Sequence, residues 1–216
     1  MPDQSEPDAV TWHRLWRDLD LDPPPGAVDQ ILAAYDDPKR HYHSRQHLRD
    51  SLRRLRAVQG CAREPVLIEL ALWFHDAVYR ADRSDNEEQS SHWARRCLLE
   101  AGADTETTDT VAHLILATGH DSEMPEGDAA LLCDIDLAIL GAPRRAYHRY
   151  QQAIRDEYAW VPKALYQKGR AKILQRLLGR EKIYHTELFS QRLERRARAN
   201  LTRELGELAG EEEAPA

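Results

Sequence analysis

The segment from Leu67 to Val78 reads LIELALWFHDAV, and its apolar residues recur with the spacing of an α-helix. Intervals of three and four residues place one set of side chains on a single helix face, namely Leu67, Leu70, Ala71, Phe74 and Val78. Pro65, just upstream, suits the first turn of a helix, where its missing N–H is not needed. The segment therefore predicts a buried helix with a histidine and an aspartate, His75 and Asp76, at its end.

Helical spacing extends over most of the chain. The other expected helices start after Gly26, near Tyr42, at Ser84–Glu87 (which has the form of a capping box), before Val111, and over 129–140, 143–160, 162–178 and 181–208. No run alternates apolar and polar residues between turn signals as a strand would. We therefore predict an all-α fold, a single domain of eight or nine helices.

The composition is that of a globular protein, with 42% hydrophobic and 31% charged residues in a chain of 216. The longest uninterrupted apolar run, Leu70–Phe74, has five residues, whereas a membrane-spanning helix needs about 20. The N-terminus lacks the apolar core of a secretory signal. Cys61, Cys97 and Cys133 form no CxxC pair and are typical of reduced thiols. We expect a cytoplasmic protein with no membrane partner.

The two ends of the chain differ from its middle. The first ten residues are polar and acidic, and the last residues include Glu211, Glu212 and Glu213. We therefore expect a flexible N-terminal tail over 1–10, a helical domain over 11–208 and a disordered acidic tail over 209–216.

The net charge of −7 is unevenly distributed along the sequence. Residues 144–203 contain 16 Lys and Arg against 5 Asp and Glu, a net of +11, which leaves −18 for the remainder. One explanation is solvated helix faces of opposite sign. The other is that a basic C-terminal third faces an acidic, metal-holding part with an anionic substrate between them. An acidic chain argues against a dedicated nucleic-acid binder.

Histidines and carboxylates cluster at three places. His43 and His47 are four residues apart, on one face of an expected helix start. His75-Asp76 follows a buried apolar run, and the segment 133–141 sets Asp134 and Asp136 inside an apolar helix. Burying such groups without partners would cost several kcal/mol, and a shared cation removes that penalty.

The order His47, His75-Asp76, Asp136 resembles the H…HD…D signature of the HD superfamily of metal-dependent phosphohydrolases, which are all-helical. The match looks closest to a bacterial branch known as predicted metal-dependent HD phosphohydrolases. The motifs cover residues 42–141 and precede the basic helices of 143–208. The resemblance implies that His47, His75, Asp76 and Asp136 bind a metal ion. Asp134 is the alternative to Asp136, which is preferred because aliphatic residues follow the family's last aspartate closely.

Two imidazoles and two carboxylates leave open positions on a six-coordinate ion. Such a site suits Mn²⁺, Mg²⁺, Fe²⁺, Co²⁺ or Ni²⁺ better than a closed structural Zn²⁺ site, which favours thiolates. We expect one divalent ion per chain, drawn from these metals or Zn²⁺, and a water activated at an open position.

A proton donor is implied by a second resemblance. Tyr42-His43-x-x-x-His47 resembles the YHNxxH motif of HD-fold cyclic nucleotide phosphodiesterases, whose first histidine protonates the leaving oxygen, so His43 is the expected donor. Ser44 replaces the Asn of that motif. Tyr79 stands where HD nucleotidases acting on deoxynucleoside monophosphates carry a Glu. Neither substrate is therefore inferred.

Further candidates have both a structural and a catalytic explanation. Glu87 or Glu88 either compensates a helix dipole or orients the attacking water. His120 either interacts with a helix C-terminus or faces the pocket, where it contacts substrate or a second metal. Arg155 and Arg170 are each either a surface charge or a member of an ion pair, or they form a phosphate clamp.

We expect hydrolysis of a phosphate ester in a small phosphorylated molecule, with a nucleotide as a candidate and a homodimer as one assembly. One alternative is a catalytically silent nucleotide-sensing protein of the same fold. Another is a di-iron oxygenase, in which His113, His120 and Glu88 would supply extra ligands. The chain has no P-loop, dinucleotide-binding GxGxxG or nucleophile elbow.

Overall fold

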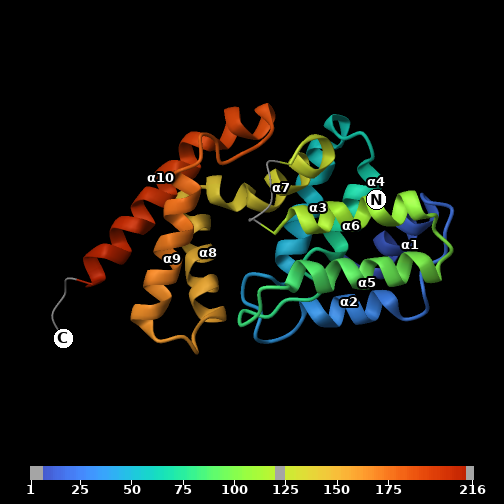
Figure 1. Cartoon of the computed structure of the whole chain (residues 1–216), viewed down its shortest axis with the longest axis horizontal. Coiled ribbons are helices and arrows are strands. Elements are labelled where there is room, and N and C mark those ends of the chain that lie inside the picture. The colour runs from blue at the N-terminus through green and yellow to red at the C-terminus, as the bar shows by residue number, and fades with distance from the viewer. Residues whose placement is uncertain (1–6, 120–124, 213–216) are drawn as a thin grey trace. The chain divides into compact units, whose positions relative to one another are not determined.

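The computed structural model describes residues 7–119 and 125–212, and all regular structure within these ranges is helical (Figure 1). The helices are α1 (Ala9–Arg17), α2 (Ala27–Tyr35), α3 (Arg45–Val58), η1 (Gln59–Cys61), α4 (Pro65–Phe74), α5 (Asn86–Glu100), α6 (Thr105–Ala117), α7 (Gly127–Leu137), η2 (Ala138–Gly141), α8 (Arg144–Glu157), α9 (Lys163–Leu178) and α10 (Glu187–Glu212). The two η elements are short 3₁₀-helices. The all-α prediction is confirmed, with ten α-helices in the described ranges where eight or nine were expected. None of the described helices is both long and apolar enough to cross a membrane.

The chain divides into two compact units, one ending at Ile135 and one starting at Asp136. The division falls inside α7, which is one continuous helix from Gly127 to Leu137. Asp136 is therefore carried by the last turn of a helix that belongs mainly to the first unit.

Helix α4 lies at the centre of the first unit, where it packs against α1, α3, α5 and α6. Every residue from Ile68 to Phe74 is buried, so the helix is enclosed on all sides rather than along one stripe. Its one charged residue here, Glu69, pairs with Arg14 and lies 3.6 Å from Arg56. Burial raises the pKa of Glu69, and the two guanidinium groups oppose that shift. A wholly buried helix is thus stabilised by apolar packing and one paired charge.

Helix α1 was not among the expected helices. Asp8 caps it by accepting a bond of 2.8 Å from the Thr11 amide. Trp12 and Trp16 are fully buried, and the Trp12 ring lies 5.1 Å from the Trp73 ring of α4. The expected N-terminal tail is therefore helical from Ala9, and residues 1–6 lie outside the described ranges.

Several helix ends differ from the expectation. Helix α3 begins at Arg45 rather than near Tyr42, so His43 belongs to the preceding segment. The expected capping box at Ser84–Glu87 is not formed, because α5 begins one residue later, with Asp85 as its N-cap, and the Asp85 side chain pairs with Arg83 instead of capping the helix. At the C-terminus, α10 runs to Glu212, so the start of the expected acidic tail is helical.

The second unit contains η2, α8, α9 and α10, with α10 packed against both η2 and α9. At its core Glu204 accepts bonds of 2.7 and 3.1 Å from Nε and Nη2 of Arg170, together with the Tyr147 hydroxyl. All three residues are buried. Burial and the adjacent Glu204 carboxylate raise the pKa of Tyr147.

Other arginines of this unit bind backbone carbonyls where helices end. Arg155 donates at the end of α8, and Arg198 donates at the end of α9 and in the segment after it. The carbonyls bonded in this way belong to Tyr158, Val161, Leu178, Arg180 and Glu181. These carbonyls lie at or just beyond the ends of α8 and α9, so part of the positive charge of residues 144–203 stabilises the unit itself.

Replacing Gly141 with alanine should destabilise the protein, because α10 lies against this glycine. An added Cβ would lie 2.7 Å from Leu193 Cβ, 2.9 Å from the Tyr184 hydroxyl and 3.1 Å from the Leu193 carbonyl. Overpacking of this kind costs roughly 1–3 kcal/mol. Urea unfolding measures the change. Gly169→Ala is the matched control: its Cβ would meet nothing within 4 Å inside α9, so it should raise stability by about 0.5–1 kcal/mol. Equal effects at both positions would contradict the close approach.

Candidate metal centre

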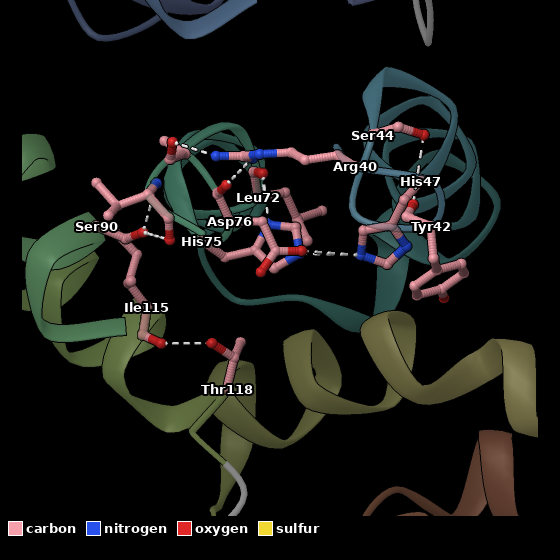
Figure 2. A network of polar contacts seen from close by, with 12 residues as sticks. Arg40, Tyr42, Ser44, His47, Leu72, His75, Asp76, Ser90, Ile115 and Thr118 are labelled. Carbon is pink, nitrogen blue, oxygen red and sulfur yellow. Dashed lines mark hydrogen bonds and ion pairs between the residues drawn. The ribbon is translucent and has the colours of Figure 1, made fainter. Parts of the chain in front are cut away.

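Two buried histidines face each other between α3 and the end of α4 (Figure 2). His47 is the third residue of α3, and His75 follows the last residue of α4 as its C-cap. Their Nε2 atoms are 3.1 Å apart. Imidazoles that approach in this way either share a proton or share a cation.

The tautomer of the His75 ring is determined by the hydrogen bond that its Nδ1 atom makes. Nδ1 lies 2.8 Å from the Leu72 carbonyl oxygen. A carbonyl can only accept, so Nδ1 carries the proton, and the Nε2 of the neutral ring presents a lone pair toward His47. A histidine held by a backbone carbonyl in this way is typical of metal ligands.

Asp76 closes a triangle with the two histidines. Its Oδ2 lies 3.1 Å from His75 Nε2 and 3.5 Å from His47 Nε2. Burial alone would raise the pKa of Asp76, but without an ion the protonated forms of His75, His43 and His47, and a hydrogen bond from protonated His75, hold it well below its usual range. The residue is therefore a carboxylate at neutral pH, which is the form that binds a cation.

The triangle has the dimensions of a metal coordination shell. Ligands about 2.1 Å from an ion lie roughly 3.0 Å apart in adjacent octahedral positions and about 3.4 Å apart in tetrahedral ones. Two of the three observed separations, 3.1 Å each, fall in this range, and the third, 3.5 Å between His47 Nε2 and Asp76 Oδ2, lies just above it. The donor set of two imidazoles and a carboxylate, with Nε2 of His75 unprotonated, thus fits a divalent ion.

Asp136 adds a second carboxylate. His47, His75 and Asp136 each offer a ligand atom within 4.8 Å of the other two, so they could hold a metal ion. Asp136 is half-buried, whereas Asp134 on the same helix is fully buried. Two residues apart on a helix, the two side chains point about 200° from each other.

Asp136→Asn should weaken metal binding, while Asp134→Asn should leave it unchanged and lower stability instead. The expected loss is at least about tenfold in affinity for Mn²⁺, since the substitution replaces a charged ligand. Competition with a fluorescent chelator measures the affinity, and thermal unfolding without metal measures the stability. The opposite pattern would make Asp134 the ligand.

His43 lies beside this group, in the segment before α3. Its ring stacks on Tyr79 with centroids 3.9 Å apart and planes 23° from parallel. The half-buried ring also lies 6.1 Å from the His47 ring, centre to centre, and its charged form lowers the pKa of Asp76. Tyr79 therefore orients His43, the expected proton donor.

The other expected catalytic residues lie at different places. Glu87, in the first turn of α5, is half-buried beside Gly119, and a Cβ added to that glycine would lie 3.5 Å from Glu87 Cγ. Glu88 is exposed, and so is His113 on α6. His120 lies outside the described residues. The exposure of Glu88 and His113 gives no support to a second metal ligated by them.

Arg155 and Arg170 both have partners within the second unit. Arg155 binds two backbone carbonyls and lies 4.6 Å from the centre of the Tyr166 ring. Arg170 is buried and donates to the Glu204 carboxylate, and its Nη1 atom lies 3.3 Å from the Tyr150 hydroxyl. These contacts favour a structural role for the two guanidinium groups, and the phosphate clamp stays a prediction.

One contact at the site was not anticipated from the sequence. Arg40, in the segment between α2 and α3, donates to the backbone carbonyls of Asp76 and Ala77. No spacing rule links a residue of this segment to the end of α4, 36 positions later. The only local signal is its place just before the Tyr42–His47 motif.

Comparisons with protein-family models, with curated proteins and with solved structures each found no match.

Proposed function

We propose that this chain is a divalent-metal-dependent hydrolase of phosphate esters in small phosphorylated molecules. The observation that supports it most is the triangle of His47 Nε2, His75 Nε2 and Asp76 Oδ2, with separations of 3.1–3.5 Å. The motif resemblance to HD phosphohydrolases supplies the reaction class, and the geometry supplies the reason to expect a cation.

His47, His75, Asp76 and Asp136 would hold the ion. When bound, a divalent ion supplies an electrophile for a phosphoryl oxygen and lowers the pKa of coordinated water. Three or four protein ligands leave positions open for substrate and water on a six-coordinate ion.

The chain's own residues contribute positioning and proton transfer. His75 is fixed in its ligand tautomer by the Leu72 carbonyl. His43, whose ring stacks on Tyr79 and lies 6.1 Å from the His47 ring, is the proposed proton donor for a leaving oxygen. It would donate without serving as a ligand itself.

The test is a hydrolysis screen of the protein loaded with Mn²⁺ or Co²⁺. The panel contains p-nitrophenyl phosphate, bis-p-nitrophenyl phosphate, and nucleoside mono-, di- and triphosphates. We expect phosphate or nitrophenol release that a chelator stops and that His75→Ala abolishes. His43→Gln should keep the metal and lose about 10²–10⁴-fold in kcat, the usual contribution of a general acid.

Two results would contradict the proposal. Hydrolysis that persists in His75→Ala would come from another site or from a contaminant. A metal-loaded protein that binds nucleotides but cleaves no ester of the panel would support the silent sensing alternative instead.

A further inference from the structure

Asp76 lies outside any helix, yet its carboxylate must keep one orientation to face both imidazoles. Helix α4 ends at Phe74, His75 is its C-cap, and the Ala77 amide bonds back to the Phe74 carbonyl at 2.8 Å. The carbonyls just beyond a helix C-terminus have no partners within the helix. The conformation of this turn therefore depends on the groups that bind the carbonyls of residues 76 and 77.

Arg40 binds both of them. Its Nη1 donates to the Asp76 carbonyl at 2.6 Å, and its Nη2 donates to the Ala77 carbonyl at 3.1 Å. Figure 2 shows the side chain reaching from the segment before α3 to the turn that carries Asp76. Arg40 precedes His47 by seven residues, so one side chain ties the segment leading to the first histidine to the turn after the second.

Aromatic rings hold the guanidinium in place. Its central carbon lies 5.6 Å from the Tyr35 ring centre and 5.7 Å from the Tyr79 ring centre, both within range of a cation–π interaction. Tyr35 is fully buried at the end of α2. Tyr79 stacks in turn on His43. These ring contacts thus hold the guanidinium donors of Arg40 beside the turn.

We propose that Arg40 is a positioning residue for the metal centre, which fixes the two peptide planes after Asp76 and so aims the Asp76 carboxylate at His47 and His75. The inference rests on the proposed function, since it assumes that this carboxylate is a metal ligand. Two donors on one rigid fork, bound to consecutive carbonyls, restrict the backbone where one donor would leave it free to rotate.

Lysine cannot replace this arrangement. Its ammonium is a single point of charge on a flexible stem, and it lacks the planar fork that meets two carbonyls at once. Arg40→Lys therefore keeps the charge and most of the apolar stem but loses the orientation. Arg80→Lys is the matched control, because Arg80 lies four residues after Asp76 and its guanidinium binds the exposed Asp82.

The experiment titrates Co²⁺ alone into the full chain and into both variants, at a temperature where circular dichroism shows all three folded. The affinity comes from calorimetry, and the geometry of the site comes from the visible absorption of the bound Co²⁺. We expect Arg40→Lys to bind Co²⁺ about 10–100-fold more weakly, with altered absorption bands, as for loss of a group that supports a ligand. Arg80→Lys should match the parent in both measurements.

Arg40→Lys with the parent's affinity and spectrum would overturn this inference and leave the proposed function intact. Equal weakening in Arg80→Lys would also overturn it, because the effect would then not depend on the fork. A parent chain that binds no Co²⁺ would overturn the proposed function, and the inference with it.

Discussion

His75→Ala should abolish tight metal binding. The Nε2 of His75 lies 3.1 Å from both His47 Nε2 and Asp76 Oδ2, so this nitrogen belongs to both short edges of the triangle. Removing this ligand should weaken metal affinity more than the 10–100-fold that follows the removal of a group that only supports a ligand. We therefore expect an affinity for Mn²⁺ at least about a hundredfold weaker.

Elemental analysis after dialysis against Mn²⁺ measures this, together with the shift in Tm on adding the ion. An ion at 100 times its Kd stabilises the folded state by about 2.7 kcal/mol, and the variant should lose that increment. His113→Ala is the control, because His113 is an exposed histidine on α6. Loss of metal in His113→Ala as well would favour the di-iron alternative.

Glu204→Gln should strongly destabilise the second unit. Glu204 is the carboxylate that balances the buried Arg170, which it meets through two bonds of 2.7 and 3.1 Å. Glutamine keeps the size of the side chain and removes its charge, so the guanidinium is left buried without a counter-ion. Breaking a buried pair in this way costs roughly 3–5 kcal/mol.

Urea unfolding of three variants tests this explanation. Arg170→Met combined with Glu204→Leu should recover most of the loss, because apolar residues of similar size need no counter-ion. Glu187→Ala, which breaks the exposed pair with Lys182, should leave the unfolding free energy unchanged. A single Glu204→Gln variant as stable as the parent would show that Arg170 is not held by this carboxylate.

The sequence predicted those parts of the site that depend on local periodicity. Helix α4 was expected because its apolar residues recur at helical spacing, and the structure confirms the helix but ends it at Phe74, before Val78 of the expected stripe. The meeting of His47 with His75 was expected only through the motif resemblance. His43 was placed on a helix start, but α3 begins two residues later.

The remaining features depend on contacts between distant segments. Arg40 reaches Asp76 through backbone carbonyls, which leave no mark on the sequence. Arg170 was a candidate for either an ion pair or a phosphate clamp, and its partner could not be named, because Glu204 is 34 residues away and carries no motif. The close approach at Gly141 likewise arises from α10 and the segment before it. Periodicity predicts which face of a helix is buried, but not which residue lies opposite.

The central claim is that His47, His75 and Asp76 surround a divalent ion. Crystals grown with Mn²⁺ test it most directly, because anomalous scattering locates the ion without assumptions about the ligands. We expect one anomalous peak per chain, about 2.0–2.3 Å from His47 Nε2, His75 Nε2 and Asp76 Oδ2. A Mn²⁺-saturated crystal with no peak inside this triangle, and with the two imidazoles joined by a hydrogen bond instead, would contradict it.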